Sequence, residues 1–383
     1  MSARGQGTSW CQALIVAWTL TGCGSHGGKP GADASAPDEQ VDGPDDPADG
    51  LTDLTDTVGY DLSDARNHDL NADLKPDRPA SFTIVEFPIP TANSMPLDLA
   101  PGPDGNVWFT ENRANQIGRV TPAGVITEFP IPTAGSSPGG IALGSDGNLW
   151  FTEGKGNKIG RITPAGVITE FLLPNAASNP GDIELGADGN VWFAETTANR
   201  IGRITSAGEI KEFPVDAPWY LTAGPRGDIW FTHVPVADSG GFGDRIVAKM
   251  TTTGTITNFP SMIPNSSPMT ITTGSDGNLW FVEPTLLFSI GRMTPTGQIT
   301  HFPMKTQGTS GFAITTGPDN NVWYSVPGSG NTTLGRVTPA GEVTEYPVPT
   351  PWALIYRMTA GPDGNVWFAE NGTTANKVGY IVP

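Results

Sequence analysis

The chain has 383 residues, of which 39 are acidic and 21 are basic, so its formal net charge at pH 7 is −18. A protein this acidic cannot neutralise phosphate groups, so the composition argues against nucleic acid and anionic membrane surfaces as partners. Its only two cysteines, Cys11 and Cys23, lie near the start, so we expect neither a disulfide nor a cysteine-based metal site in the main body.

Residues 1–23 resemble a bacterial lipoprotein signal. The apolar stretch between the two cysteines is too short to span a bilayer, and the tetrapeptide LTGC ending at Cys23 matches the lipobox. The resemblance implies cleavage before Cys23 and lipid attachment to it; an ordinary secretory signal is the alternative. Gly24 follows the cysteine in place of an aspartate, which favours the outer membrane. We therefore expect a bacterial cell-envelope protein that meets the membrane only through a lipid anchor, or a secreted one.

Residues 24–80 form an acidic segment with fourteen carboxylates and four basic residues. The segment is rich in Asp, Pro, Gly and Ala, and Tyr60 is its only aromatic residue. Such a composition cannot bury enough apolar surface to offset the entropy of ordering. None of its aspartate clusters has the spacing of a calcium loop. We predict a disordered spacer between the anchor and residues 81–383.

Residues 81–383 contain a repeat marked by tryptophan. The spacings between successive repeats are 38 to 50 residues. A period in the low forties without a helical pattern predicts a β-propeller whose blades are four-stranded antiparallel sheets. The seven repeat tryptophans are Trp108, Trp150, Trp192, Trp230, Trp280, Trp323 and Trp367.

The second repeat gives the plan of one blade. Its four predicted strands are 139–144, 148–153, 158–163 and 167–171. Asp146-Gly147 and the Pro-Ala-Gly segment at 164–166 supply the backbone conformations that tight hairpins need. Residues 82–87 read as a fourth strand without its first three, and residues 377–383 as a third strand without a fourth. We therefore predict one all-β, seven-bladed, monomeric propeller in which the N-terminal strand completes the last blade, with the aromatic repeats in its core.

A glutamate recurs at the end of the second strand. It is present in five repeats, as Glu111, Glu153, Glu195, Glu283 and Glu370, while His233 and Val326 take its place in the fourth and sixth. We expect these residues at one mouth of the central channel, together with the residues that start the innermost strands. A ring of carboxylates there can hold a cation, because close carboxylates otherwise repel one another. Solvated or backbone-capping glutamates, kept by the repetition, are the alternative.

The fourth repeat has an enlarged connection at the same mouth. The segment 233–245 is eight residues longer than its counterpart in the first repeat. It is either a lid or specificity loop or a neutral insertion. Trp219 and Tyr220 add aromatic surface nearby.

The repeat signature resembles the virginiamycin B lyase (streptogramin B lyase) family over about residues 81–383. The segments ITEFPIPT, SSPGGIALG and SDGNLWFTEGKGNKIGRITPAG carry the likeness. The resemblance implies a seven-bladed propeller that linearises cyclic depsipeptides by elimination. It also implies Mg²⁺ held by glutamates at the channel mouth and a histidine base at the start of an innermost strand. Elimination needs such a base and a cation that stabilises the developing negative charge.

Only part of that site is present. By position, Glu283 and Glu370 match metal ligands, but the family's Glu-x-His motif has no counterpart in any of the seven strand starts. His233 lies at a glutamate's place and is a weak substitute for the base. His301 falls in an outer strand, where we expect it on the surface.

The sequence therefore favours a propeller without catalysis that binds a ligand or an envelope protein at its mouth. The residues expected there are Trp219, Tyr220, Met269, Phe312 and Tyr356. A Mg²⁺-dependent carbon–oxygen lyase acting on streptogramin B-type depsipeptides, with His233 as its base, is the alternative, so the enzymatic status is open. A purely structural role at the envelope is the third hypothesis.

Overall fold

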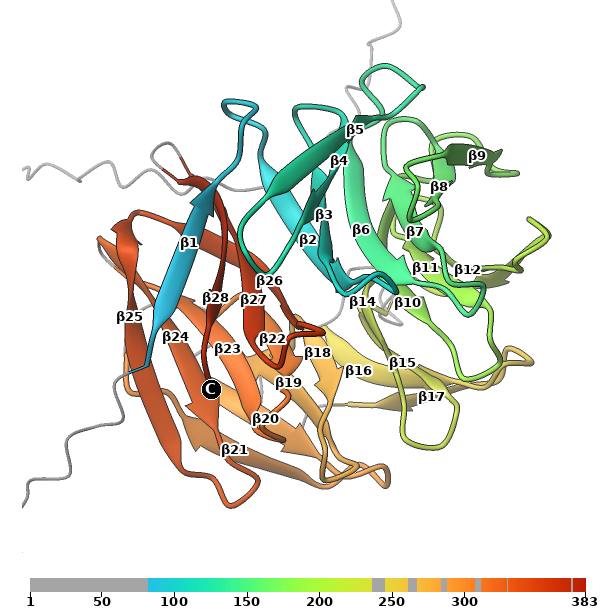
Figure 1. The fold of residues 1–383 in the computed structure, drawn as a ribbon. Helices are drawn as coiled ribbons and strands as arrows, with labels where there is room; N and C mark the ends of the chain where they lie inside the picture. Colours follow the sequence, from blue (N-terminus) through green and yellow to red (C-terminus); the bar gives the residue numbers. More distant parts are fainter. Residues whose placement is uncertain are drawn as a thin grey trace, which may run out of the picture. The chain divides into compact units, whose positions relative to one another are not determined.

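The structure, a computed structural model, describes residues 82–235, 245–260, 267–283, 288–306, 311–328, 330–372 and 375–383. In these residues 28 strands form seven antiparallel four-stranded sheets (Figure 1). This confirms the predicted all-β, seven-bladed propeller. The predicted signal, the spacer and most of the long fourth-blade connection lie outside the described residues. None of the described residues belongs to a helix long and apolar enough to cross a membrane.

Each blade is numbered here from its innermost to its outermost strand. Blade one has β2 (Pro96–Pro101), β3 (Val107–Glu111), β4 (Gln116–Val120) and β5 (Ile126–Pro130). Blade two has β6 (Pro138–Leu143), β7 (Leu149–Glu153), β8 (Lys158–Ile162) and β9 (Ile168–Leu172). Blade three has β10 (Pro180–Leu185), β11 (Val191–Glu195), β12 (Arg200–Ile204) and β13 (Ile210–Pro214). Blade four has β14 (Pro218–Ala223), β15 (Ile229–His233), β16 (Ile246–Met250) and β17 (Ile256–Phe259). Blade five has β18 (Ile271–Thr273), β19 (Leu279–Glu283), β20 (Ser289–Met293) and β21 (Ile299–Pro303). Blade six has β22 (Ile314–Thr316), β23 (Val322–Pro327), β24 (Asn331–Val337) and β25 (Val343–Pro351). Blade seven has β26 (Leu354–Ala360), β27 (Val366–Asn371), β28 (Asn376–Ile381) and β1 (Ile84–Pro88).

The N-terminal strand closes the propeller, as predicted. β1 pairs antiparallel with β28, from Ile84 opposite Ile381 to Pro88 opposite Lys377. Figure 1 shows β1, in blue, beside β28, in dark red. Blade seven is therefore built from both ends of the propeller sequence, which leaves no unpaired seam in that sheet.

The Asp-Gly turn does more than reverse the chain. In blade one the indole Nε1 of Trp108 donates to Oδ1 of Asp104 at 3.1 Å, and Asn106 Nδ2 donates to Oδ2 at 2.8 Å. Gly105 has a φ of 76°, which a residue with a side chain adopts less readily. Six blades have this aspartate–tryptophan bond; blade four has Arg226 at the aspartate's position.

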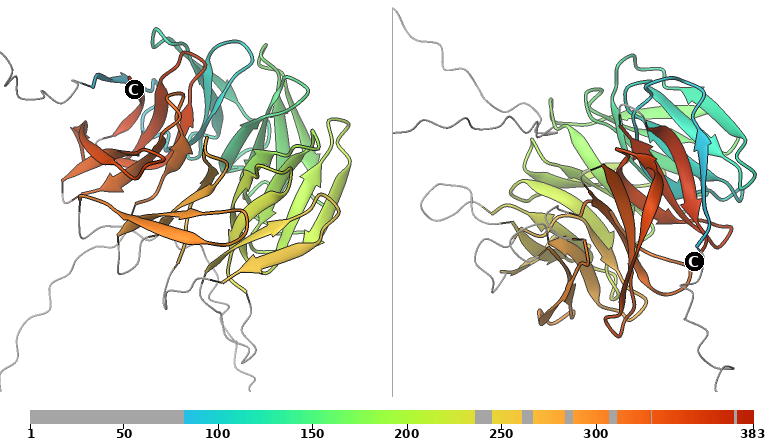
Figure 2. Two further views of the ribbon diagram at one scale, coloured as in Figure 1. Left: turned by 90° about the horizontal axis from the view of Figure 1, so that it is seen from below. Right: turned by 90° about the vertical axis from the view of Figure 1, so that its left-hand side faces the viewer.

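The core lies between adjacent sheets, which pack face against face (Figure 2). Trp108 of blade one belongs to the same buried cluster as Phe151 of blade two. On its own sheet Trp108 stacks on Phe129 with 5.4 Å between ring centroids, and Arg119 lies over the indole at 5.3 Å. The repeat tryptophans are thus buried, as predicted, and the aromatic repetition serves packing.

In six blades a glycine in the third strand makes room for the aromatic ring that follows the tryptophan, while blade four has Ala248 at that place. A Cβ placed on Gly118 would lie 2.1 Å from the ring of Phe109. The same close approach occurs between Gly160 and Phe151. Such short distances are sterically impossible, so glycine is needed at these positions.

Candidate functional site

Aromatic side chains gather where the innermost strands begin. Phe312 and Tyr356, from blades six and seven, have ring centroids 5.3 Å apart. Trp219 and Tyr220 of blade four lie 6.4 Å apart, and Trp219 is 37% exposed. The structure thus describes two aromatic pairs among the five predicted mouth residues. Apolar, partly exposed rings of this kind suit ligand contact.

Met269 and Phe312 lie just before their assigned strands. β18 and β22 begin only at Ile271 and Ile314. The backbone N–H of Met269 nevertheless donates to Val282 O at 2.9 Å, and that of Phe312 donates to Ser325 O at 3.1 Å. Both residues are therefore hydrogen-bonded to the second strand of their blade and lie where the innermost strand was expected to start.

A charged cluster lies one residue deeper in the channel. Arg357 of blade seven stacks on Tyr220 of blade four, with its Cζ 4.6 Å from the ring centroid. Its guanidinium donates to Asp182 of blade three and lies 3.9 Å from Asp98 of blade one. The cluster lines a channel cavity of about 340 Å³, which also includes Glu184. Arg357 therefore connects four blades across the axis.

Three carboxyl groups share this single guanidinium. Burial raises the pKa of Asp98 to about 6 against the attraction of Arg357. Burial, with repulsion from Asp182 and Asp98, raises the pKa of Glu184 to about 8. Glu184 is therefore mostly protonated at pH 7. Sequence reasoning missed this cluster, although Asp98, Asp182 and Arg357 occupy equivalent positions in their strands and could have been found by aligning the repeats.

The recurrent glutamates are buried inside the blades. Glu111, Glu153, Glu195 and Glu370 are each 0% exposed, and Glu283 is 1% exposed. Glu111 lies on the face of β3 that carries Phe109, and Phe109 packs in a cluster with blade seven. The glutamates do end the second strands as predicted, but their carboxyl groups are covered rather than arrayed around an open mouth.

Each of these glutamates in blades one, two, three and seven meets a second glutamate from the outermost strand. The pairs are Glu111 with Glu128, Glu153 with Glu170, Glu195 with Glu212 and Glu370 with Glu86. The outer member binds the connection that leads in from the preceding blade. Glu128, for example, accepts bonds from the backbone N–H and the hydroxyl of Thr91, both at 3.0 Å.

Proton sharing makes these pairs possible. Burial, with repulsion from Glu128, raises the pKa of Glu111 to about 8. Burial and Glu86 raise that of Glu370 to about 8. Burial acts to raise the pKa of Glu86, but hydrogen bonds from Lys377 and Thr350 outweigh this effect and lower the pKa. In the pair of Glu370 and Glu86 the inner carboxyl group is therefore mostly protonated at pH 7 while the outer one stays ionised, so the two do not repel each other.

In the other three blades a different polar pair takes the place of the two glutamates. In blade four His233 Nε2 lies 3.2 Å from Asn258 Oδ1. In blade five His301 Nε2 lies 2.6 Å from Glu283 Oε2, so His301 is not the surface residue that we expected. In blade six, where Val326 replaces the inner glutamate, the hydroxyl of Tyr324 donates to Glu345 at 2.9 Å.

His233 is enclosed in blade four. The side chain is 4% exposed, and its Nδ1 lies 3.2 Å from the backbone oxygen of Asp216. Burial lowers its pKa, although contacts with Asp216 and Asn258 act in the opposite direction. The neutral ring is thus held by neighbours on both nitrogens, and the side chain does not extend into the channel cavity.

The carboxylates do not fit a shared magnesium site. No group of three or more His, Cys, Asp or Glu side chains in the described ranges is arranged to hold a metal ion. Glu283 is engaged by His301 in blade five, and Glu370 by Glu86 in blade seven. Mg²⁺ is usually held by one or two carboxylates together with several waters, and each of these two carboxyl groups is instead engaged within its own blade. Metal binding by either residue alone stays a prediction.

Comparisons with known proteins agree on one family. The model of the Virginiamycin B lyase family matches residues 79–241 and 217–383. The solved structure of selenomethionine-substituted virginiamycin B lyase from Staphylococcus aureus is 34% identical, with a TM-score of 0.70, and the match covers 79% of this chain and 99% of that one. A catalytically inactive variant of that enzyme with quinupristin gives the same figures. A streptogramin B lyase structure is 33% identical over 78% of this chain and 97% of that one, with a TM-score of 0.70.

Proposed function

The chain belongs to the virginiamycin B lyase family, and from this membership we propose that it is a lipid-anchored envelope propeller whose mouth binds a ligand without converting it. Trp219, Tyr220, Met269, Phe312 and Tyr356 form the proposed contact surface. The bound partner is a small molecule or an envelope protein with an apolar, partly aromatic surface. Cys23 carries the lipid; Cys23→Ser moves the protein from the membrane fraction to the soluble fraction of cells.

The observation that supports a binding role is the Phe312–Tyr356 ring pair. These rings, 5.3 Å apart, stand at the starts of two innermost strands, the kind of position at which the family resemblance implies a histidine base. A phenol and a phenyl ring do not accept a proton near neutral pH, and burial raises the pKa of Tyr356 further. His233 and His301, the two histidines of the propeller sequence, are held by neighbours within blades four and five.

Binding is tested with the mouth rings removed. A thermal-shift screen of small cyclic peptides identifies a ligand, and calorimetry gives its affinity. The double variant Trp219→Ala/Phe312→Ala weakens binding by about tenfold or more. Leu172→Ala, which removes a more exposed apolar side chain from the outer strand β9, leaves the affinity unchanged. Equal affinity in the double variant and the wild type rejects the mouth as the binding surface.

The sequence identity of 34% with a virginiamycin B lyase favours a second candidate function, Mg²⁺-dependent ring opening of a streptogramin B. The assay incubates purified protein with the antibiotic and excess Mg²⁺ and follows the linear product by mass spectrometry. The binding proposal expects no turnover. Turnover that His233→Ala abolishes establishes the lyase in its place.

A further inference from the structure

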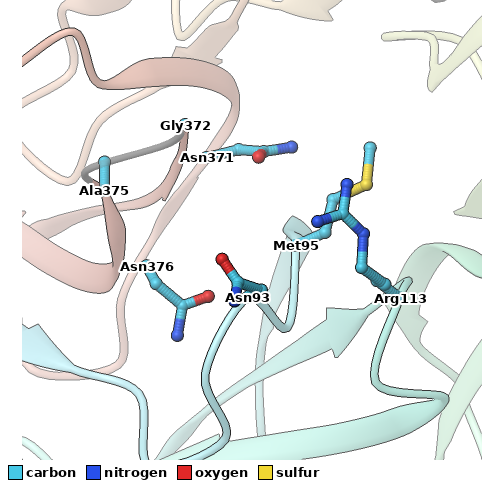
Figure 3. Close-up of a pocket in the computed structure, with 7 residues that line it drawn as sticks. All are labelled: Asn93, Met95, Arg113, Asn371, Gly372, Ala375 and Asn376. Atoms are coloured by element: carbon cyan, nitrogen blue, oxygen red, sulfur yellow. The ribbon is translucent and has the colours of Figure 1, made fainter.

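A second pocket lies between blades one and seven, outside the channel. Its volume is about 210 Å³, and it is bordered by Asn93, Met95, Arg113, Asn371 and Asn376. Figure 3 shows Asn371 at the end of β27 projecting toward Met95 and Arg113, with Asn93 on the lower side of the same space. None of the five proposed mouth residues lines it, so it is a separate site.

The pocket lies where the two ends of the propeller sequence meet, between the end of β27 and the connection that leads into blade one. In two other blades the residue after the inner glutamate ties its blade to the next: Asn112 Nδ2 donates to Pro138 O at 2.9 Å. Thr196 Oγ1 makes the equivalent bond to Pro218 O at 2.6 Å. Asn371 has the same position after Glu370, yet no described residue accepts a hydrogen bond from its amide. The amide faces the pocket, as Figure 3 shows, and is available to a ligand.

Arg113 brings a positive charge that the protein does not neutralise there. No carboxylate of the described residues lies within 4.0 Å of its guanidinium, although the chain has a net charge of −18. Seven other arginines of the described residues have such a partner, for example Arg119 with Asp104 at 3.6 Å. A free guanidinium beside free amides offers several N–H donors in fixed directions, which suits a carboxylate and the peptide group next to it.

The remaining wall is rigid and polar. Asn376 accepts bonds from the backbone N–H and the hydroxyl of Ser94, at 2.9 and 3.1 Å, and donates to Thr91 O at 2.9 Å. These bonds hold β28 against the incoming connection of blade one and fix the pocket's shape. None of the described residues that line the pocket is aromatic, so these residues offer no stacking platform that would favour a sugar or a nucleobase.

We propose that this pocket binds the free C-terminal carboxylate of a peptide. Arg113 pairs with the carboxylate, the amides of Asn93 and Asn371 bond to the adjoining peptide group, and Met95 contacts the terminal side chain. The volume is below the range of about 300–1,000 Å³ that is typical of sites for drug-sized ligands, so the pocket takes the end of a chain and leaves the rest outside.

The probe for this site is N-acetyl-glycyl-glycine, with its C-terminal amide as the uncharged match. Titration into the isotope-labelled full propeller, followed by NMR, shifts the backbone resonances of Asn93, Arg113 and Asn371 with the acid and much less with the amide. For so small a ligand the expected Kd is about 1 mM. Arg113→Ala raises that Kd about tenfold or more, and Arg113→Lys restores part of the affinity.

Lys155 provides the matched control, since it has the position of Arg113 one blade on. Lys155→Ala leaves the affinity for the acid unchanged. The proposal is wrong if the acid shifts no resonance at about 10 mM, if acid and amide bind equally, or if both alanine variants lose affinity together. Because the probe reports on the closure between blades one and seven, these results do not depend on whether the mouth binds a ligand.

Discussion

Glu111 illustrates how a carboxyl group is tolerated inside a blade. Its pKa rises from 4.5 to about 8 because the group is buried and faces Glu128. The folded protein therefore keeps a proton that the unfolded chain has already lost between these two pH values. A group with a raised folded pKa contributes its full stability below the unfolded pKa, and that contribution falls as the pH rises through the folded pKa. The inner glutamates thus weaken the fold in mildly alkaline solution.

Replacing Glu111 by glutamine imitates the protonated acid and removes its titration. Between pH 7 and pH 9 the wild type loses stability at this position, while Glu111→Gln loses about 1 kcal/mol less. Urea unfolding at the two pH values measures the difference. Glu209→Gln, at an exposed glutamate of blade three, follows the wild type. A Glu111→Gln curve parallel to the wild type would show that Glu111 is ionised when folded.

The position of these glutamates could be predicted from the sequence, but their surroundings could not. Glu111 and Glu128 are seventeen residues apart, and nothing in the repeat distinguishes a carboxylate beside a channel from one that faces an outer strand. The deciding feature is Gly118, which lies in the strand between the two glutamates and pairs with Phe109 on one side and Glu128 on the other. Because Gly118 has no side chain, nothing on this strand separates the carboxyl groups of Glu111 and Glu128. The prediction that His301 lies on the surface was wrong for the same reason, because Gly291, which pairs with His301, has no side chain to separate it from Glu283.

Blade six, in which a tyrosine and a glutamate replace the glutamate pair, allows a direct test of this contact. Tyr324 keeps the ring position that phenylalanine has in the other blades, and its hydroxyl donates to Glu345 at 2.9 Å. Tyr324→Phe removes one hydrogen bond to a charged group and destabilises the protein by about 1–2 kcal/mol. In a double-mutant cycle with Glu345→Gln, measured by urea unfolding, the two losses are less than additive. Strict additivity would mean that the hydroxyl contributes through packing alone.

At the scale of the element, the hairpin in six of the seven blades is held by a carboxylate that the sequence showed only as part of a turn. Burial acts to raise the pKa of Asp146, but hydrogen bonds from Asn148 and Trp150 outweigh this effect and lower the pKa. A lowered folded pKa means that the contribution is present above the unfolded value of 3.8 and is lost as the pH falls through the folded pKa. The sequence predicted the Asp-Gly turn from backbone conformation. It did not reveal the indole bond, because that depends on the rotamer of the tryptophan.

Asp146→Ala leaves the indole N–H of Trp150 without its partner at 3.0 Å. The expected loss of stability is about 1–3 kcal/mol. Blade four contains its own control, because Arg226 stands at the aspartate's position there. Arg226→Ala should change the free energy of unfolding by about 0.5 kcal/mol or less. Similar losses in both variants, measured by urea unfolding, would assign the effect to the turn instead of the indole bond.

At the scale of the whole molecule, the channel cluster depends on closure of the ring. Asp182 and Arg357 are 175 residues apart in the chain. Their meeting across the axis requires every blade to be in place. This explains why the number of blades and their closure followed from repeat counting, while the charged cluster did not. Blades are local units, and the axis is where distant ones converge.

Deleting β1 should therefore affect the molecule as a whole. Removal of residues 1–91 leaves β28 without its five paired residues and removes Phe87 from the cluster that contains Trp367. It also removes Glu86, the partner of Lys377 at 2.6 Å. The exposed edge of β28 then promotes association between copies. Calorimetry and size-exclusion chromatography should show a lower melting temperature and aggregates, whereas removal of residues 1–80 alone leaves both unchanged. A monomeric protein of unchanged melting temperature after deletion of residues 1–91 would mean that six complete blades and three strands of the seventh are sufficient for closure.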